Sequence, residues 1–473
     1  MIFSSNSFLF IFLPITLLGY YAFRGRQRNY WLLFVSLIFF GWSQPGYLWI
    51  ILLSILINYT FARLVDRTTG RGRVAFLVAG VVSNLALLFY FKYFNFFFGS
   101  IDTVLGTHFS GREIILPIGI SFFTFQGLSY LIDVYRGDVP VQKNLLNIAL
   151  YIVLFPQLIA GPIVRYSDIS REIDSRIVDP ELFAGGVQRF IIGLAKKAIL
   201  ANTMASLADG IWDRAGGVTQ NTWLIAWVGS IAYTLQIYYD FSGYSDMAIG
   251  LGRMFGFHFA ENFNLPYISK SISEFWRRWH ISLSGWFRDY VYIPLGGNRK
   301  RVYLNLTIVF LLTGAWHGAA WHFVLWGLWN LIFILVERVV RTHSGKKDSS
   351  HNLVKNTVAR IYTLFVVNLG WVLFRAPTLR ACLDYIRTMF GISRPAEPDF
   401  TVFWYLNRWT ILIMIISVFF SSELPEKIKN CIKDRVSVSV YASVKYVTLI
   451  LIFALSVIRI VSGTYNPFIY FQF

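Results

Sequence analysis

Residues 302–336 read VYLNLTIVFLLTGAWHGAAWHFVLWGLWNLIFILV, an apolar-biased block of 35 residues. A helix crosses the hydrocarbon core of a bilayer with about 20 residues, so this block is too long for one untilted helix. Basic residues flank both ends, at 299–301 and at 338 and 341. Matching charge at both ends favours an even number of crossings. We therefore predict a helical hairpin or a broken helix at Gly314–Gly318, with His317 at the break.

The composition of the whole chain also indicates a membrane protein. The 473 residues are 56% apolar and 14% charged, and the mean hydropathy is +0.53. Soluble domains carry about 25% charged residues. The formal net charge of +18 comes from short basic runs between apolar segments. Nucleic-acid binding needs one basic patch, so these runs are better interpreted as cytoplasmic anchors.

Long apolar runs predict an all-α, polytopic bundle of about 11 to 13 membrane segments. No soluble domain of useful size remains between them, so we expect a single integral-membrane domain over residues 1–473, with its core motifs at 233–334. The clearest candidate segments are Ser7–Phe23, Val74–Phe98, Leu145–Pro162, Trp223–Tyr239, Trp404–Phe420 and Ser443–Val461.

Several common chemistries find no support in the sequence. The two cysteines, Cys382 and Cys431, form no CxxC pair, and the zinc-peptidase spacing of histidines is absent. Neither a GxSxG elbow nor a phosphate-binding GxxxxGK[ST] loop occurs. We therefore expect no metal site and no common hydrolase or ATPase mechanism.

His317, which follows Trp316, is the first candidate for catalysis. A titratable ring at membrane depth is costly, and it is usually retained because it lines a cavity or carries out chemistry. Its neighbours are small: Gly314, Ala315, Gly318, Ala319 and Ala320. Small residues allow a helix or a ligand to approach closely. One interpretation is a general base or acid, and the other is a packed histidine bonded to a backbone carbonyl.

His280 is the second candidate, in a stretch that reads FWRRWHISLSGWFRD over residues 275–289. Read as one amphipathic helix, it has residues 277, 280, 284 and 288 on a polar face and aromatic residues opposite. The helix then either lies at the membrane interface or forms the wall of an active-site funnel. In the second case Arg277, Arg278 and Arg288 would bind an anionic cofactor such as coenzyme A.

Aspartates form a further polar island, at Asp240 and Asp246 in the sequence YYDFSGYSD of residues 238–246. The island is either a loop at the membrane interface or a functional group. In the functional case, one aspartate orients a catalytic group or pairs with an arginine of residues 277–288. We include Asp240, Asp246, Asp289 and Trp316 as candidates for the lining of the site.

The motifs of residues 275–284 and 286–298, together with Trp316-His317-Gly318, resemble the membrane-bound O-acyltransferase family. The resemblance spans nearly the whole chain. The two ends, Phe3-Ser4-Ser5 and residues 468–473, resemble the bacterial alginate O-acetyltransferase subfamily, which also contains peptidoglycan and cellulose acetylation proteins. The resemblance implies a helical bundle around a central tunnel, with His317 as the catalytic residue and His280 as the second polar position.

The resemblance further implies that acetyl-CoA is the donor and that the chain lies in the bacterial cytoplasmic (inner) membrane. The acetyl group would pass across the membrane lipid to a secreted or periplasmic acetyltransferase partner, which modifies an exported polysaccharide. Two alternatives remain open. A related enzyme could acylate a protein or a lipid, and a transporter would also use buried histidines and broken helices. Against a transporter, the sequence shows no internal repeat.

Overall fold

The computed structural model describes residues 1–107, 114–213, 221–344, 352–393, 400–433, 435–463, 465–467 and 469. Over these residues the secondary structure consists of helices, with no strand. Six helices are long and apolar enough to cross a membrane: Pro45–Arg67, Gly70–Leu105, Pro180–Trp212, Trp321–His343, Leu353–Arg375 and Val438–Ser462. Three shorter apolar helices are Phe8–Ala22, Val302–His317 and Arg408–Phe420. The all-α, multi-pass prediction is confirmed, and the count of 11 to 13 segments stays a prediction.

The chain forms two compact units, and each is described by itself. The first comprises residues 1–190 and 244–261. Aromatic rings fill its interior, and the Tyr20 hydroxyl donates to the Phe255 carbonyl at 2.7 Å. Its helices are η1 (Phe8–Phe12), α1 (Leu13–Ala22), α2 (Gln27–Ser43), η2 (Pro45–Tyr47), α3 (Leu48–Arg67), α4 (Gly70–Leu88), η3 (Phe89–Tyr93), α5 (Phe94–Leu105), α6 (Ile120–Arg136), α7 (Leu145–Val153), α8 (Phe155–Leu158), α9 (Tyr166–Asp174) and most of α10 (Pro180–Ala195).

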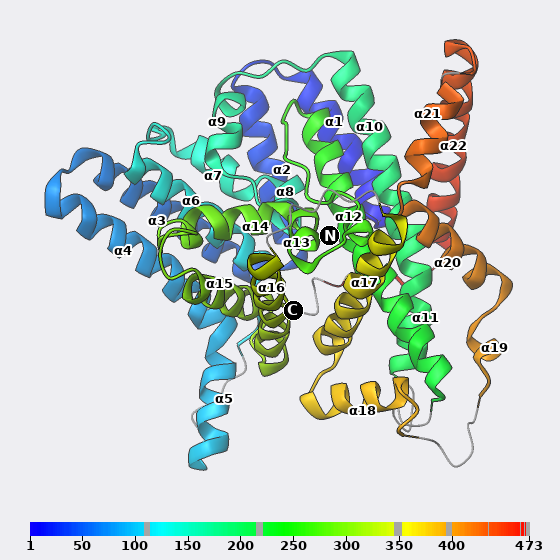
Figure 1. Ribbon diagram of the computed structural model, residues 1–473. Helices are drawn as coiled ribbons and strands as arrows, with labels where there is room; N and C mark the ends of the chain where they lie inside the picture. Colours follow the sequence, from blue (N-terminus) through cyan, green and yellow to red (C-terminus); the bar gives the residue numbers. More distant parts are fainter. Residues whose placement is uncertain are drawn as a thin grey trace. The chain divides into compact units, whose positions relative to one another are not determined.

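The second unit comprises residues 191–243 and 262–473 and contains both motif histidines. Its helices are given in chain order, and Figure 1 labels the α-helices among them. They are η4 (Lys196–Ala201), α11 (Asn202–Trp212), the first part of α12 (Trp223–Met254), η6 (Pro266–Ile268), α13 (Ile272–Arg278), α14 (Ile281–Phe287), η7 (Arg288–Tyr292), α15 (Val302–His317), α16 (Trp321–Ser344), α17 (Leu353–Arg375), α18 (Leu379–Met389), α19 (Val402–Tyr405), α20 (Arg408–Phe420), α21 (Leu424–Lys433) and α22 (Val438–Ser462).

Two of the expected membrane segments are not continuous helices. In Leu145–Pro162, α7 ends at Val153, and the extended residue Leu154 separates it from the short helix α8, which has a proline in its first turn. In Trp404–Phe420, α19 ends at Tyr405 and α20 begins only at Arg408. The sequence did not show these two interruptions, because apolar composition alone does not reveal where the backbone leaves the helical conformation.

Helices α15 and α16 form the predicted hairpin, with His317 as the last residue of α15 (Figure 1). The chain leaves the helix at Gly318, whose backbone is extended. Close packing of the two helices depends on glycine. A Cβ at Gly314 would lie 2.4 Å from the Phe323 carbonyl oxygen, and one at Gly327 would lie 2.4 Å from the Phe310 carbonyl oxygen. The prediction of a break at Gly314–Gly318 is confirmed.

The stretch of residues 275–289 is not one helix, which corrects the predicted amphipathic face. Helix α13 ends at Arg278, and α14 begins at Ile281. His280 lies between them with φ 45° and ψ 55°, in the left-handed region. This turn breaks the 3.6-residue period, so residues 277, 280, 284 and 288 do not share one helical face. The αL conformation costs a non-glycine residue about 1–3 kcal/mol.

We expect Gly314→Ala to lower activity and stability together. The added methyl group would meet the Phe323 backbone, and overpacking of this kind costs about 1–3 kcal/mol. Separation of α15 from α16 would also move His317, so any activity that depends on His317 should fall further than protein yield. The measurement is activity per milligram of purified protein, together with its thermal midpoint in detergent.

The matched control is Gly99→Ala in α5, where a Cβ would meet no atom within 4 Å. Alanine is the better helix former by about 1 kcal/mol, so this variant should be as stable as the wild type or more so. Equal behaviour of the two variants would contradict the proposed role of glycine in the α15–α16 contact.

Candidate active site

The two motif histidines both lie close to Trp316. The Trp316 ring centroid is 5.1 Å from that of His317 and 6.0 Å from that of His280. His280 is 1% exposed, His317 is 7% exposed and Trp316 is 4% exposed. Two imidazoles that are 37 positions apart in the sequence therefore share one buried region. The structure brings together three of the predicted site residues.

His317 sits among aromatic rings at the end of α15. The Trp326 ring of α16 is 5.0 Å away and the Phe374 ring of α17 is 5.3 Å away, both close to perpendicular. Because the helix ends at His317, the ring lies where the backbone changes direction rather than along a helix face. His322, five residues after His317, lies on the next helix, α16. Its ring contacts Phe323 at 4.1 Å.

His280 is held by Asn262. The Asn262 side-chain oxygen lies 3.2 Å from His280 Nδ1, and the Asn262 carbonyl accepts from the backbone N–H of Ile281 at 2.9 Å. The Phe241 ring of α12 packs edge-on against the imidazole at 4.6 Å. Burial, followed by the effect of nearby His317, holds the pKa of His280 well below its usual value. The imidazole is therefore neutral at pH 7.

Helix α16 fixes the position of α13, which leads into His280. The Glu337 carboxylate accepts from the backbone N–H groups of Ile272 and Ser273 at 2.6 and 3.0 Å, at the positive end of the helix dipole. Seven residues earlier on the same helix, Asn330 accepts from the Trp276 indole at 3.2 Å. Helix α16, which follows His317, therefore also anchors helix α13, which precedes His280.

The three predicted coenzyme-binding arginines have different surroundings. Arg278 is paired with Glu274 at 2.9 Å, and it also donates to the Asn264 carbonyl. Arg288 is paired with its neighbour Asp289 at 2.6 Å, and it is 65% exposed. Arg277 is exposed, and it makes no ion pair with the described residues. The structure therefore leaves Arg277 as the guanidinium of the three that is most available for an anionic ligand.

The aspartates are not placed as expected, and these interpretations need correction. Asp240 and Asp246 lie inside helix α12 and are buried, so they do not form an interface loop. Asp240 pairs with Lys197 at 2.6 Å in the second unit, and Asp246 pairs with Arg189 at 2.6 Å in the first. Neither pairs with an arginine of residues 277–288. Their spacing did not reveal cationic partners 43 and 57 positions earlier in the chain.

Several residues of the site carried no signal in the sequence. Asn262, Asn330 and Glu337 are single polar residues outside any motif. Their roles follow from tertiary contacts with residues 272–282. A lone polar residue within an apolar helix, such as Asn330, is a general signal for a buried hydrogen bond, but it does not identify the partner.

Known proteins resemble this chain over most of its length. Residues 37–369 match the model of the membrane-bound O-acyltransferase family. The chain is 38% identical to the probable alginate O-acetylase AlgI of Azotobacter vinelandii, over the full length of both proteins. It is 36% identical to the peptidoglycan O-acetyltransferase of Helicobacter pylori, over 83% of this chain and 80% of the relative. The teichoic acid D-alanyltransferase of Bacillus subtilis is 28% identical over 56% of this chain and 70% of the relative.

Proposed function

Because the chain belongs to the membrane-bound O-acyltransferase family, we propose that it takes acetyl groups from acetyl-CoA on the cytoplasmic side and passes them outward. The membrane would be the bacterial cytoplasmic (inner) membrane, and the final acceptor an exported or cell-wall polysaccharide. A periplasmic acetyltransferase partner would complete the transfer. The relatives named for alginate and peptidoglycan acetylation support the substrate class. The pair of buried histidines around Trp316 is the structural observation that carries the proposal.

The chemistry that these residues can perform is acyl transfer to a hydroxyl. The acceptor oxygen attacks the thioester carbonyl, the carbon–sulfur bond breaks, and His317 takes the hydroxyl proton and returns it to the departing thiolate. A positioned base contributes roughly 10²–10⁴ in rate. Positioning of the two substrates must supply the rest. A cytosolic thioester and an external acceptor can meet at one histidine only if a tunnel reaches it from both faces, so the predicted tunnel is part of the proposal.

The acceptor can be tested in cells. The chain is expressed, together with a secreted acetyltransferase, in a bacterium whose own polysaccharide O-acetylase has been deleted. We expect base-labile acetate to return to the exported polysaccharide. Acetate on a lipid or a protein, with none on the polymer, would favour the alternative acceptors and contradict the polysaccharide proposal. The same strain without the secreted partner tests whether that partner is needed.

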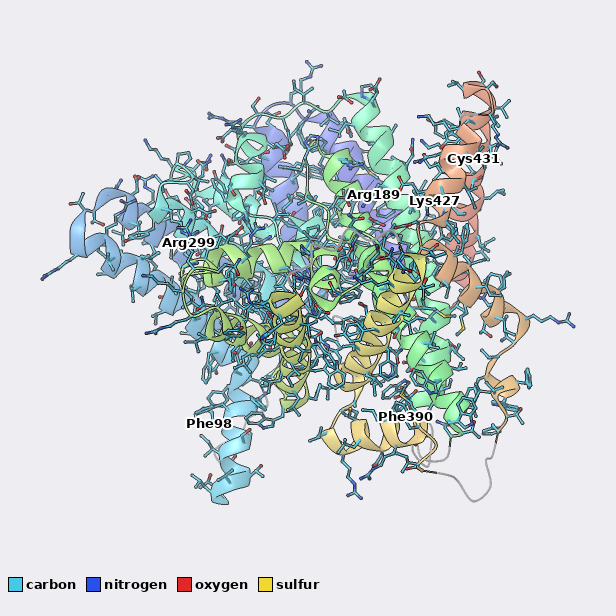
Figure 2. All side chains as sticks on the ribbon, viewed as in Figure 1. Phe98, Arg189, Arg299, Phe390, Lys427 and Cys431 are labelled. Carbon is cyan, nitrogen blue, oxygen red and sulfur yellow. The ribbon has the colours of Figure 1, made fainter. Side chains whose placement is uncertain are left out.

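We expect Arg277→Ala to raise the KM for acetyl-CoA about tenfold with little change in kcat. Coenzyme A carries phosphate groups, and a charge-assisted hydrogen bond from arginine to phosphate is worth about 1.5–3 kcal/mol. Exposed basic residues at 299–301, of which Arg299 is labelled in Figure 2, add positive charge in the segment before α15. Initial rates at varied acetyl-CoA concentration provide the measurement.

Arg288→Ala is the matched control, because the guanidinium that it removes is already paired with Asp289. It should change KM much less than Arg277→Ala does. A larger effect at Arg288 would overturn the assignment of Arg277 to the donor.

A further inference from the structure

The side-chain oxygen of Asn262 determines which tautomer a neutral His280 ring adopts. The Asn262 side-chain oxygen accepts from the backbone N–H of Ser282 at 3.2 Å and from the Ser282 hydroxyl at 2.9 Å. A backbone N–H can only donate, so the Asn262 atom that faces it must be the oxygen and not the NH₂ group. The same oxygen lies 3.2 Å from His280 Nδ1. In a neutral imidazole, Nδ1 must therefore carry the hydrogen and donate it.

The other ring nitrogen follows from this assignment. With its hydrogen on Nδ1, the neutral ring has a lone pair on Nε2. That atom is buried and has no hydrogen-bond partner among the residues that the structure describes. A buried polar atom without a partner costs about 1–3 kcal/mol. Its occurrence beside Trp316 and His317 indicates that a substrate atom completes the hydrogen bond.

The backbone supports the same geometry. His280 is in the left-handed conformation, which is unfavourable for its side chain. Asn262 stabilises this turn through two oxygens. Its backbone carbonyl accepts from Ile281 N–H, and its side-chain oxygen accepts from Ser282 N–H. Asn262 is itself 1% exposed. Asn262 therefore stabilises the strained turn at His280 and also determines the tautomer of its ring.

We propose that Asn262 is a positioning residue that fixes His280 as the Nδ1–H tautomer, so that its bare Nε2 accepts a hydrogen bond from a second O–H or N–H group of a substrate, not from the hydroxyl that reacts. His317 removes the proton of the reacting hydroxyl. The inference rests on the proposed acyl transfer and deepens it, since it divides the work between the two histidines. No bond is made or broken at His280, which orients that substrate.

Asn262→Asp tests the inference with almost no change of shape. The carboxylate keeps both Ser282 bonds, which favour its ionised form, and it now stabilises an imidazolium at His280. His280 must be neutral to accept at Nε2, so the acidic limb of the pH–activity profile should move to higher pH. An opposite charge at this range shifts a titration by about 1–3 pH units. His317 is the titratable neighbour that acts on His280, and it is unchanged in the variant.

The assay uses membranes that contain the full chain and radiolabelled acetyl-CoA as the probe. The readout is label in the polysaccharide fraction. Rates are measured from about pH 5.5 to about pH 9, which covers both sides of the ordinary histidine pKa. Asn407→Asp is the matched control: its side chain accepts from Thr410 N–H at the start of α20, where Asp caps a helix as well as Asn does. Its profile should match the wild type. Asn262→Ala should lower the rate without moving the acidic limb.

The outcomes separate the inference from the proposed function. Wild-type membranes that transfer no label would contradict the function itself. Active wild type with an unshifted Asn262→Asp profile would overturn the role of Asn262. If the variant does not fold, nitrogen NMR of ¹⁵N-histidine-labelled wild type decides, with His280 assigned by its loss in His280→Gln. A protonated Nδ1 supports the inference, and a protonated Nε2 overturns it.

Discussion

His317→Ala is expected to reduce polymer acetylation to background while the protein still inserts and folds. The side chain ends helix α15 and lies among Trp316, Trp326 and Phe374. Loss of a general base costs roughly 10²–10⁴ in rate, and in cells such a loss leaves no detectable ester. The measurement is base-labile acetate on the exported polymer, with the amount of protein in the membrane determined in parallel.

His322→Ala is the control for His317→Ala. His322 is on α16 against Phe323, outside the group around Trp316, so most activity should remain. His280→Ala should lower activity less completely than His317→Ala, because His280 orients a substrate in this account and does not take its proton. Near-normal acetylation in His317→Ala would exclude it as the base. Greater loss in His280→Ala would reverse the two roles.

Asp240→Ala is expected to give the largest loss of stability. Asp240 pairs with Lys197 at 2.6 Å, and the two side chains are 2% and 3% exposed. Its other oxygen accepts from the backbone N–H of Ile469 at 2.9 Å, and Lys197 also donates to the Pro467 carbonyl. The substitution takes this counter-ion from the buried Lys197 ammonium and removes the acceptor of the Ile469 N–H. Breaking such a pair costs about 3–5 kcal/mol, against a total stability of about 5–15 kcal/mol.

Thermal unfolding in detergent provides the measurement for Asp240→Ala. Two controls separate the buried charge from other effects. Asp289→Ala removes an exposed pair with Arg288, which is worth about 1 kcal/mol or less. The double variant Lys197→Met with Asp240→Leu removes both charges and should recover most of the stability. An Asp240→Ala protein that melts with the wild type would contradict the structural role of this pair.

The sequence was informative where a physical requirement is local. An apolar block of 35 residues with small residues at its centre must break or turn, and the structure has a hairpin with His317 at the end of its first helix. The pairing of both histidines with tryptophan in apolar sequence likewise predicted a buried site. Both rings are buried beside Trp316.

The sequence was uninformative where distant residues determine a conformation. Helical periodicity over residues 275–289 concealed the left-handed turn at His280, where the oxygens of Asn262 accept hydrogen bonds from the backbone N–H groups of Ile281 and Ser282. It also did not show that Asp240 pairs with Lys197 and that Asp246 pairs with Arg189. Charged residues within α12 and α10 can be recognised as costly in a membrane, but only the tertiary structure identifies the partner of each.

Not every polar residue of the chain belongs to the site. Figure 2 shows Lys427 and Cys431 on α21, where Cys431 is exposed. The basic side chain of Lys427 pairs with Glu423 four residues earlier. Such exposed pairs contribute little to stability, in contrast to the buried pair of Asp240 and Lys197. The expected effects of substitution therefore follow burial rather than charge.

The central claim is that one buried histidine connects a cytoplasmic thioester with an acceptor on the other face of the membrane. Sealed inside-out vesicles that contain the chain, the proposed secreted acetyltransferase and the polysaccharide test this claim most directly. Radiolabelled acetyl-CoA is added outside, at the cytoplasmic face. The account predicts ester-linked label on lumenal polysaccharide, protected from an added esterase and absent with His317→Ala. Label that stays on the outer face, or that reaches the lumen equally well with His317→Ala, would contradict it.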